Sequence, residues 1–347
     1  MTSADALVRA AAAERGPLAF SEVMDLALYD PEQGFYATVG RAGRLGDFLT
    51  SPEVGPLFGA VVARALDALW AEAGRPATMT AVEAGAGPGT LARAVLAAEP
   101  ECRRALRYVM VECSAAQRAL HQPLLDRTDV TVESRADLPA AARALTVVLA
   151  NELLDNLPFD LFERTADGWA EVRVGAGDEG LVEVPVPAGT DDAELLGRLA
   201  PAAATGARVP RPRLAAAWVD AATALGDHVI AFDYATTTPH LAALPQDEWL
   251  RTYRQHNRGV SPLEHLGGQD VTCEVAVDQL PVPRSDRSQA DWLVAQGLED
   301  LVAEGRRTWA ERRHIGDLAA VRARSRVTEA DALLDPTGLG AFRVLEW

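Results

Sequence analysis

The chain has 347 residues, 48% of them hydrophobic, and a formal net charge of −17 at pH 7, which suits one large or two smaller domains with a substantial core. The negative charge disfavours binding to nucleic acid, because phosphate contact needs a basic surface. No apolar run approaches the roughly 20 residues of a membrane span. The sequence contains no lysine, which excludes a Schiff-base pyridoxal enzyme and a P-loop nucleotidase.

The cysteines and the N-terminal segment indicate whether the protein has a metal site or disulfides and whether it is secreted. The three cysteines have no CxxC spacing and no histidine cluster beside them, so neither a metal site nor a disulfide framework is indicated. The first 16 residues carry charges throughout and lack a secretory apolar region. We therefore expect a cytoplasmic protein that contacts neither membrane nor nucleic acid.

The predicted elements change character along the chain. Residues 1 to about 75 are predicted to be mostly helical around an irregular loop at 30–56, with one helix at 58–71. Apolar runs then alternate with helical patterns, which predicts a parallel sheet covered by helices on both faces. The strands are expected near 79–84, 107–112, 129–133, 145–150 and 228–233. Hairpin strands at 159–164, 169–175 and 181–186 form an insertion, and a strand at 270–280, a helical stretch at 290–324 and a last strand at 341–347 follow.

The most informative segment is 79–91, MTAVEAGAGPGTL. An apolar run ends at Glu83 and is followed by Gly85, Gly87 and Gly89. Glycine suits positions where the backbone takes a positive φ or lies against a ligand. A dinucleotide fingerprint is GxGxxG, whereas GxGxG with a carboxylate two residues earlier is the first motif of S-adenosylmethionine-dependent methyltransferases. An ordinary strand-to-helix turn is the alternative.

A second apolar strand, LRYVMVE, ends in Glu112 about 25 residues downstream. In a right-handed βαβ unit this strand lies beside the first, and its C-terminal acid reaches the cofactor ribose. Glu112 is therefore a candidate acceptor for the two ribose hydroxyls. The alternative is a solvated acid at a strand end.

The fourth strand is followed by Asn151, Glu152 and Asp155 in the segment NELLDNLP. Ligands of open α/β sheets bind outside the carboxyl ends of the strands, so these side chains are expected to face the transferred methyl group. Carboxylates there could clamp a guanidinium or amine and receive its proton. The alternative is a helix start, with Asn151 as N-cap and Glu152 complementing the helix dipole.

The chain resembles the MidA-like family, which includes the mitochondrial complex I assembly methyltransferases. The matching segments run nearly end to end: MDLALYDPEQGFY, GDFLTSPEVGPLFG, EAGAGPGTL, VEC, ANELLDNLP, FDY, LRTYRQH, GGQDVT and GLGAFRVL. The resemblance implies an α/β, class I methyltransferase (Rossmann-like) fold with a doubly wound, mostly parallel sheet. We expect an N-terminal helical and lid region at 1–75, the core at 76–156 and 226–347, and an inserted β-rich substrate-side subdomain at 157–225.

The resemblance also assigns roles to further residues. The GDFLTSPE segment is expected to fold over the cofactor, with Asp47 and Thr50 joining Glu83 and Asn151 in binding it; a turn followed by a helix start is the alternative for residues 51–53. Tyr253 and His256 in LRTYRQH are candidate substrate-binding residues, although a lone histidine is often structural.

The substrate half of the chain departs from the family pattern. Ala235 replaces a common glycine, Glu274 the usual histidine and Ala276 the next acid. The predicted function is S-adenosylmethionine-dependent methyl transfer to a nitrogen (guanidinium or amine) or oxygen nucleophile of a protein, peptide or small metabolite. A catalytically silent assembly factor on the same fold and a nicotinamide-dependent oxidoreductase are the alternatives. The oligomeric state is not predicted.

Overall fold

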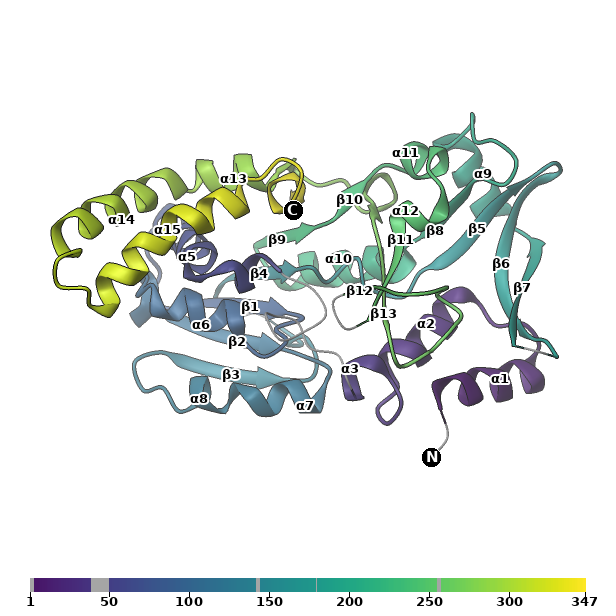
Figure 1. Ribbon diagram of the computed structural model, residues 1–347, viewed down its shortest axis with the longest axis horizontal. Coiled ribbons are helices and arrows are strands. Elements are labelled where there is room, and N and C mark those ends of the chain that lie inside the picture. Colours follow the sequence, from purple (N-terminus) through teal and green to yellow (C-terminus); the bar gives the residue numbers. More distant parts are fainter. Residues whose placement is uncertain (1–2, 39–49, 142–143, 179, 255–256) are drawn as a thin grey trace.

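A computed structural model describes residues 3–38, 50–141, 144–178, 180–254 and 257–347 (Figure 1). Its main sheet has seven strands in the order β15-β16-β9-β4-β1-β2-β3. Five of them are parallel: β1 (Met79–Ala84), β2 (Leu106–Val111), β3 (Thr131–Arg135), β4 (Leu145–Asn151) and β9 (His228–Asp233). The antiparallel β16 (Arg343–Glu346) and β15 (Ser285–Ser288) complete the edge. The predicted doubly wound, mostly parallel sheet is confirmed.

The strand order reverses between β1 and β4, which are paired in parallel from Met79 with Leu145 to Ala84 with Ala150. From β1 the chain proceeds to β2 and β3 on one side, and from β4 to β9 on the other. At such a switch point the loops beyond the strand ends diverge and leave a crevice for ligands. The carboxyl ends of β1 and β4 are therefore the place to look for a site.

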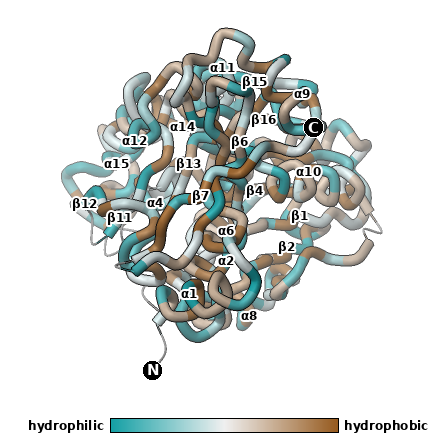
Figure 2. The backbone as a smooth tube through the Cα atoms, turned by 90° about the vertical axis from the view of Figure 1, so that its right-hand side faces the viewer, coloured by the Kyte–Doolittle hydropathy of each residue, from teal (hydrophilic) through white to brown (hydrophobic). Residues whose placement is uncertain are grey.

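Helices cover both faces of this sheet. Both faces must be covered because successive apolar residues of β1 point into different cores. Ala81 packs in a core that includes side chains from α5 (Pro56–Glu72), α6 (Thr90–Ala97), α14 (Leu298–Arg312) and α15 (Leu318–Leu333). Val82 packs on the opposite face with Ala222 of α10 (Arg213–Leu225). Hydrophobic segments run mainly through the interior of the molecule (Figure 2).

A second core lies at the other end of the molecule (Figure 1). Helices α1 (Ala4–Arg15) and α2 (Phe20–Tyr29) pack there against a four-stranded antiparallel sheet in the order β7-β6-β5-β8. Its strands are β5 (Asp160–Thr165), β6 (Gly168–Ala176), β7 (Leu181–Pro187) and β8 (Arg208–Arg211). Leu18 forms a bridge to Val174 of β6. The N-terminal helices thus share a core with the inserted sheet.

Two long predicted elements are divided in the structure. The expected strand at 270–280 becomes β13 (Asp270–Cys273), β14 (Val275–Ala276) and a 3-10 turn (Val277–Gln279), because β13 pairs with β11 (Leu250–Arg254) whereas β14 pairs with β10 (Ala235–Thr236). The helical stretch divides into α13 (Gln289–Ala295), α14 and α15, with Gly297 at φ +85° before α14.

The remaining elements are short. They are α3 (Phe35–Thr38), α4 (Ser51–Val54), α7 (Ala115–Arg118), α8 (Gln122–Leu125), α9 (Thr190–Leu199), α11 (Thr238–Ala243), α12 (Gln246–Trp249) and β12 (Asn257–Arg258), with 3-10 turns at Glu101–Arg104, Ala119–His121 and Leu339–Ala341. Among the described residues, no helix combines the length and apolar character needed to cross a bilayer.

Candidate active site

The glycine loop joins β1 to α6 at the switch point of the sheet. Gly85, Gly87 and Gly89 have φ angles of +67°, +51° and +78°, a region that side chains with a Cβ seldom occupy. The predicted need for glycine is confirmed at all three positions. A Cβ on Gly85 would lie 3.1 Å from Leu153 Cδ1, whereas one on Gly87 would meet no described heavy atom within 4 Å. The backbone of Gly87 therefore faces open space that a ligand can enter.

Glu112 follows β2 and is buried beside this loop. Its Oε2 accepts the N–H of Gly87 at 2.9 Å, and its Oε1 accepts the N–H of Ser114 at 2.8 Å. The Cys113 thiol is a third, weak donor, 3.5 Å from Oε1. A carboxylate has about four lone-pair positions, so acceptor capacity remains for a hydroxyl group. The structure thus places Glu112 where the ribose prediction needs it, and the ribose contact itself stays a prediction.

His121, which the sequence did not single out, fixes the other side of the Gly87 residue. The ring is fully buried, with Nε2 2.8 Å from the carbonyl oxygen of Gly87 and Nδ1 2.8 Å from Ser134 Oγ. Because a carbonyl oxygen only accepts, Nε2 carries a proton and donates to Gly87, while Nδ1 shares a hydrogen bond with the Ser134 hydroxyl. Gly87 is therefore held at its N–H by Glu112 and at its C=O by His121.

Glu83 lies beneath the loop and is buried. Its Oε2 accepts the hydroxyl of Tyr108 at 2.7 Å, and burial raises the pKa of the carboxyl to about 7. Thr50 is also buried, and its carbonyl oxygen accepts the N–H of Glu53 in α4. Cofactor contacts of Glu83 and Thr50 stay predictions. Asp47 lies outside the described residues.

Glu152 directly follows β4 and adopts a φ of +50°, a left-handed conformation that is unusual for a residue with a Cβ. Its Oε1 accepts the N–H of Ser51 at 3.3 Å and the side-chain amide of Asn151 at 3.1 Å. Its Oε2 is buried without a hydrogen-bond partner among the described residues. Burial and the neighbouring Asp155 raise the pKa of Glu152 to about 8. Strained backbone and perturbed pKa values are each enriched at functional sites, so Glu152 is a candidate functional residue.

The alternative reading of this segment as a helix start is wrong. The residues after β4 form turns, and no α-helix begins between Asn151 and Pro158. The segment instead contacts other elements: the N–H of Glu152 donates to the carbonyl of Phe232 in β9, and the N–H of Leu154 donates to Asp233 Oδ2.

Asp155 lies beyond Glu152 and is buried. Its Oδ2 accepts the hydroxyl of Thr272 at 2.5 Å, while its Oδ1 has no partner within the described part of the chain. Burial raises the pKa of Asp155 to about 6. Asp270 also faces this region, where it accepts the hydroxyl of Tyr36 at 3.1 Å. Burial and the charge of Asp155 raise the pKa of Asp270 to about 7.

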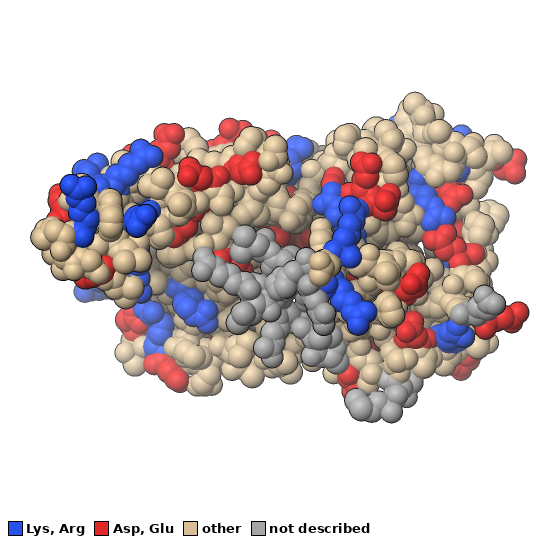
Figure 3. Space-filling model, viewed as in Figure 1, with Lys and Arg blue, Asp and Glu red and all other residues tan. Residues whose placement is uncertain are grey.

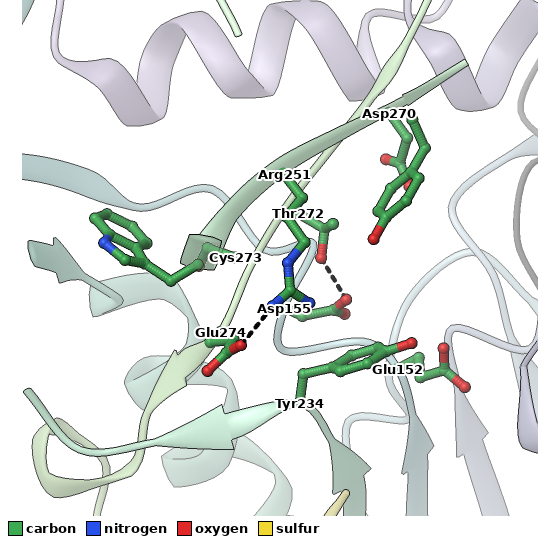
Figure 4. Close-up of a pocket in the computed structure, with 10 residues that line it drawn as sticks. Glu152, Asp155, Tyr234, Arg251, Asp270, Thr272, Cys273 and Glu274 are labelled. Atoms are coloured by element: carbon green, nitrogen blue, oxygen red, sulfur yellow. Dashed lines mark hydrogen bonds and ion pairs between the residues drawn. The ribbon is translucent and has the colours of Figure 1, made fainter. Parts of the chain in front are cut away.

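These acids surround a cavity of about 110 Å³ (Figure 4). Figure 4 shows Glu152 and Tyr234 near the strand ends, with Asp155 and Thr272 above them. The described residues that line the cavity are Glu152, Asp155, Tyr234, Trp249, Arg251, Tyr253, Asp270, Thr272, Cys273 and Glu274.

Arg251 is the cationic side chain of this lining, and its Nη2 lies 2.7 Å from Glu274 Oε1. Its Nε donates to the carbonyl of Glu248. The candidate substrate residue Tyr253 does line the cavity, whereas His256 lies outside the described residues. Three carboxyl groups remain after the Arg251–Glu274 pair is set aside, so the cavity favours a cationic guest.

The fold and this site together define a class I, S-adenosylmethionine-dependent methyltransferase. Residues 61–296 match the family model described as "putative S-adenosyl-L-methionine-dependent methyltransferase". Because this match covers well over half of the chain, the protein belongs to that family.

Named relatives in animals match about half of the chain. The chain is 31% identical over 199 residues to the Drosophila melanogaster protein named protein arginine methyltransferase NDUFAF7 homolog, mitochondrial, and 28% identical over 184 residues to its human counterpart. These matches cover 51% and 46% of the chain, and the chain spans less than half the length of both relatives, 46% and 42%.

Solved structures match over nearly the whole chain. A COG1565 superfamily member from Burkholderia thailandensis bound to S-adenosyl-homocysteine aligns with a TM-score of 0.82 and 26% identity, covering 99% of this chain and 91% of that one. A native structure of a COG1565 protein from the same organism gives a TM-score of 0.81 at 25% identity, over 99% and 90% of the two chains. The predicted family, fold class and methyltransferase function are confirmed.

Proposed function

We propose that this methyltransferase acts on a cationic nitrogen acceptor, with a guanidinium as the group that fits best. The observation that carries this proposal is a cavity at the ends of β4 and β9 in which Glu152 Oε2 and Asp155 Oδ1 are buried and find no hydrogen-bond partner among the residues that the structure describes. A guanidinium carries N–H donors in a fixed fork and pairs bidentately with carboxylates. Such a guest would satisfy both orphaned oxygens at once.

The glycine loop fits the cofactor. Gly87 presents backbone to open space, and Glu112 has acceptor capacity left for a ribose hydroxyl. S-adenosylmethionine supplies an electrophilic methyl group on a sulfonium, and residues 85–89, Glu112 and Asn151 would hold it at the edge of the acid-lined cavity. The chain's task is then to align the acceptor nitrogen and to exclude water.

Glu152 and Asp155 can also manage the proton of the reaction. A guanidinium nitrogen that forms a bond to a methyl carbon gives up one proton, which needs an acceptor within reach. The pKa values of about 8 for Glu152 and about 6 for Asp155 place the two carboxyl groups on either side of neutrality. One of them can therefore be ionised and accept the proton while the other still carries its own.

Several kinds of molecule could carry the acceptor group. The names of the human and fly relatives support arginine in a protein, while a peptide, a small metabolite, or an amine or oxygen nucleophile are the other acceptors we propose. Glu274 replaces the histidine usual in the MidA-like family and pairs with Arg251, so the far wall of the cavity differs from the family pattern. A cytoplasmic location likewise stays a prediction, because the named relatives are mitochondrial.

An isosteric pair of small molecules tests this proposal. Ethylguanidinium and ethylurea have nearly the same shape, but only the first is a cation. Calorimetry on the S-adenosylhomocysteine complex at pH 9, above the pKa of Glu152, is expected to show binding of ethylguanidinium, weakened at least about tenfold in Glu152→Gln, and no binding of ethylurea. Equal binding of the two molecules, or binding of ethylguanidinium unchanged in Glu152→Gln, would contradict the proposal.

A further inference from the structure

The outer end of the α14–α15 hairpin has a charge opposite to that of the protein. Between Glu304 and Arg326 the chain carries seven arginines and three acids, although its formal net charge is −17. Figure 3 shows basic side chains gathered over the end of the molecule that these two helices form in Figure 1.

The base and the outer end of this hairpin are packed differently. At the base, Leu298, Leu301 and Val302 of α14 are buried in the core of the main sheet. Further out, a Cβ added to Gly305 would lie 2.8 Å from the carbonyl oxygen of Ala323, so the two helices touch each other there. Beyond this contact the hairpin is supported mainly by its own two helices.

Large aliphatic side chains are exposed at the outer end. Ile315 is 55% exposed, Leu318 64% and Val321 55%. They lie in the turn between the helices and along the first turns of α15, where Leu318 and Val321 share a face at a spacing of three residues. Groups of exposed aliphatic residues on a protein surface often mark a site that binds a protein, a membrane or a ligand.

Arginines without ion pairs surround this apolar tip. Arg306, Arg307, Arg313 and Arg322 are exposed and form no ion pair with any described residue. Two other arginines of the hairpin are neutralised, since Arg312 pairs with Asp317 and Arg326 with Glu304. Arg324 lies over the half-buried ring of Trp309, 5.4 Å from its centroid.

We propose that this tip docks the protein on an anionic lipid surface, a property separate from methyl transfer. A turn between two helices is convex, and a bilayer surface adapts to a convex tip, whereas a protein partner would need a matching hollow. The aliphatic side chains would enter the headgroup boundary while the arginines reach lipid phosphates around them. Charges beyond about 8–10 Å are screened at physiological salt, so the acids elsewhere on the chain oppose this contact only weakly. The expectation of no membrane contact, drawn from the lack of an apolar run long enough to span a bilayer, does not cover this kind of surface docking.

Co-sedimentation of the full chain with lipid vesicles tests the proposal. Vesicles containing phosphatidylglycerol should bind the protein, pure phosphatidylcholine vesicles should not, and binding should fall as salt rises from about 0.1 to about 0.5 M. Two double variants, Leu318→Glu with Val321→Glu and Arg313→Glu with Arg322→Glu, should each lower binding roughly tenfold or more. Their circular dichroism and S-adenosylhomocysteine binding should match the wild type.

A matched control carries the same chemistry away from the hairpin. Val282 is 91% exposed, and Arg104 is exposed without an ion pair to a described residue. Val282→Glu with Arg104→Glu should leave vesicle binding unchanged. Failure of the wild type to bind anionic vesicles would overturn the proposal and favour an acidic protein surface as the partner of the tip. Equal losses in the control and the tip variants would also overturn it.

Discussion

Glu152→Gln is expected to stabilise the protein while it impairs the acceptor site. Burial, reinforced by Asp155, raises the pKa of Glu152 from an ordinary value of 4.5 to about 8. A carboxyl whose pKa is higher in the folded state binds a proton that the unfolded chain releases, so it lowers stability progressively above pH 4.5. Glutamine carries no such proton and removes this dependence.

The size of the effect follows from the pKa difference. Each pH unit between the two pKa values corresponds to about 1.4 kcal/mol. The native glutamate therefore costs about 3 kcal/mol at pH 7 and about 1 kcal/mol at pH 5, and the glutamine variant should gain up to these amounts in its free energy of unfolding.

Urea unfolding followed by circular dichroism at pH 5 and pH 7 measures this gain. Glu194→Gln, on the exposed face of α9, is the matched control and should leave stability unchanged at both pH values. A glutamine variant at position 152 that is less stable than the wild type at pH 7, or equally stabilised at pH 5 and pH 7, would refute the reasoning.

Substitutions at three further positions test separate parts of the site. Glu112→Ala should weaken S-adenosylhomocysteine by about 1–3 kcal/mol in calorimetry, because charge-assisted hydrogen bonds are lost; an unchanged dissociation constant would exclude the ribose role. His121→Ala should weaken the same ligand about five- to thirtyfold by freeing the Gly87 carbonyl, and His121→Gln should recover part of the loss, since its amide can donate; no recovery would indicate a packing role instead. Asp155→Asn should spare S-adenosylhomocysteine binding and reduce methyl transfer, whereas a wild-type rate would place proton transfer elsewhere.

Local signals made much of the main sheet predictable. Apolar runs of strand length, separated by helical patterns and glycine turns, located β1, β2, β4 and β9 within about one residue of their observed bounds. The positive φ angles at the three glycines were predictable because glycine, which lacks a Cβ, adopts such angles without steric cost. The partner of the N-terminal helices was harder to infer, since an apolar helix face does not specify which sheet will cover it.

Site residues were predictable from the sequence only where they directly follow a strand of the parallel sheet. Glu112 and Glu152 follow parallel strands, and the sheet rule brings such residues to one edge. His121 reaches the site through tertiary packing from a segment without a motif of its own. Arg251 lies in the LRTYRQH segment, from which only Tyr253 and His256 were predicted to bind substrate. The alternative of a helix start at Asn151 failed because the N–H groups of Glu152 and Leu154 donate to β9 rather than to a helix of their own.

The most direct test of the account is a calorimetric titration of the wild type and Gly87→Val with S-adenosylhomocysteine. At Gly87 a Cβ meets no described atom, yet φ is +51° and the open space is the one assigned to the cofactor. The account predicts one-to-one binding to the wild type and loss of binding in a variant that keeps its circular dichroism spectrum. Unchanged binding by Gly87→Val, or no binding by a folded wild type, would contradict the assignment of the cofactor site.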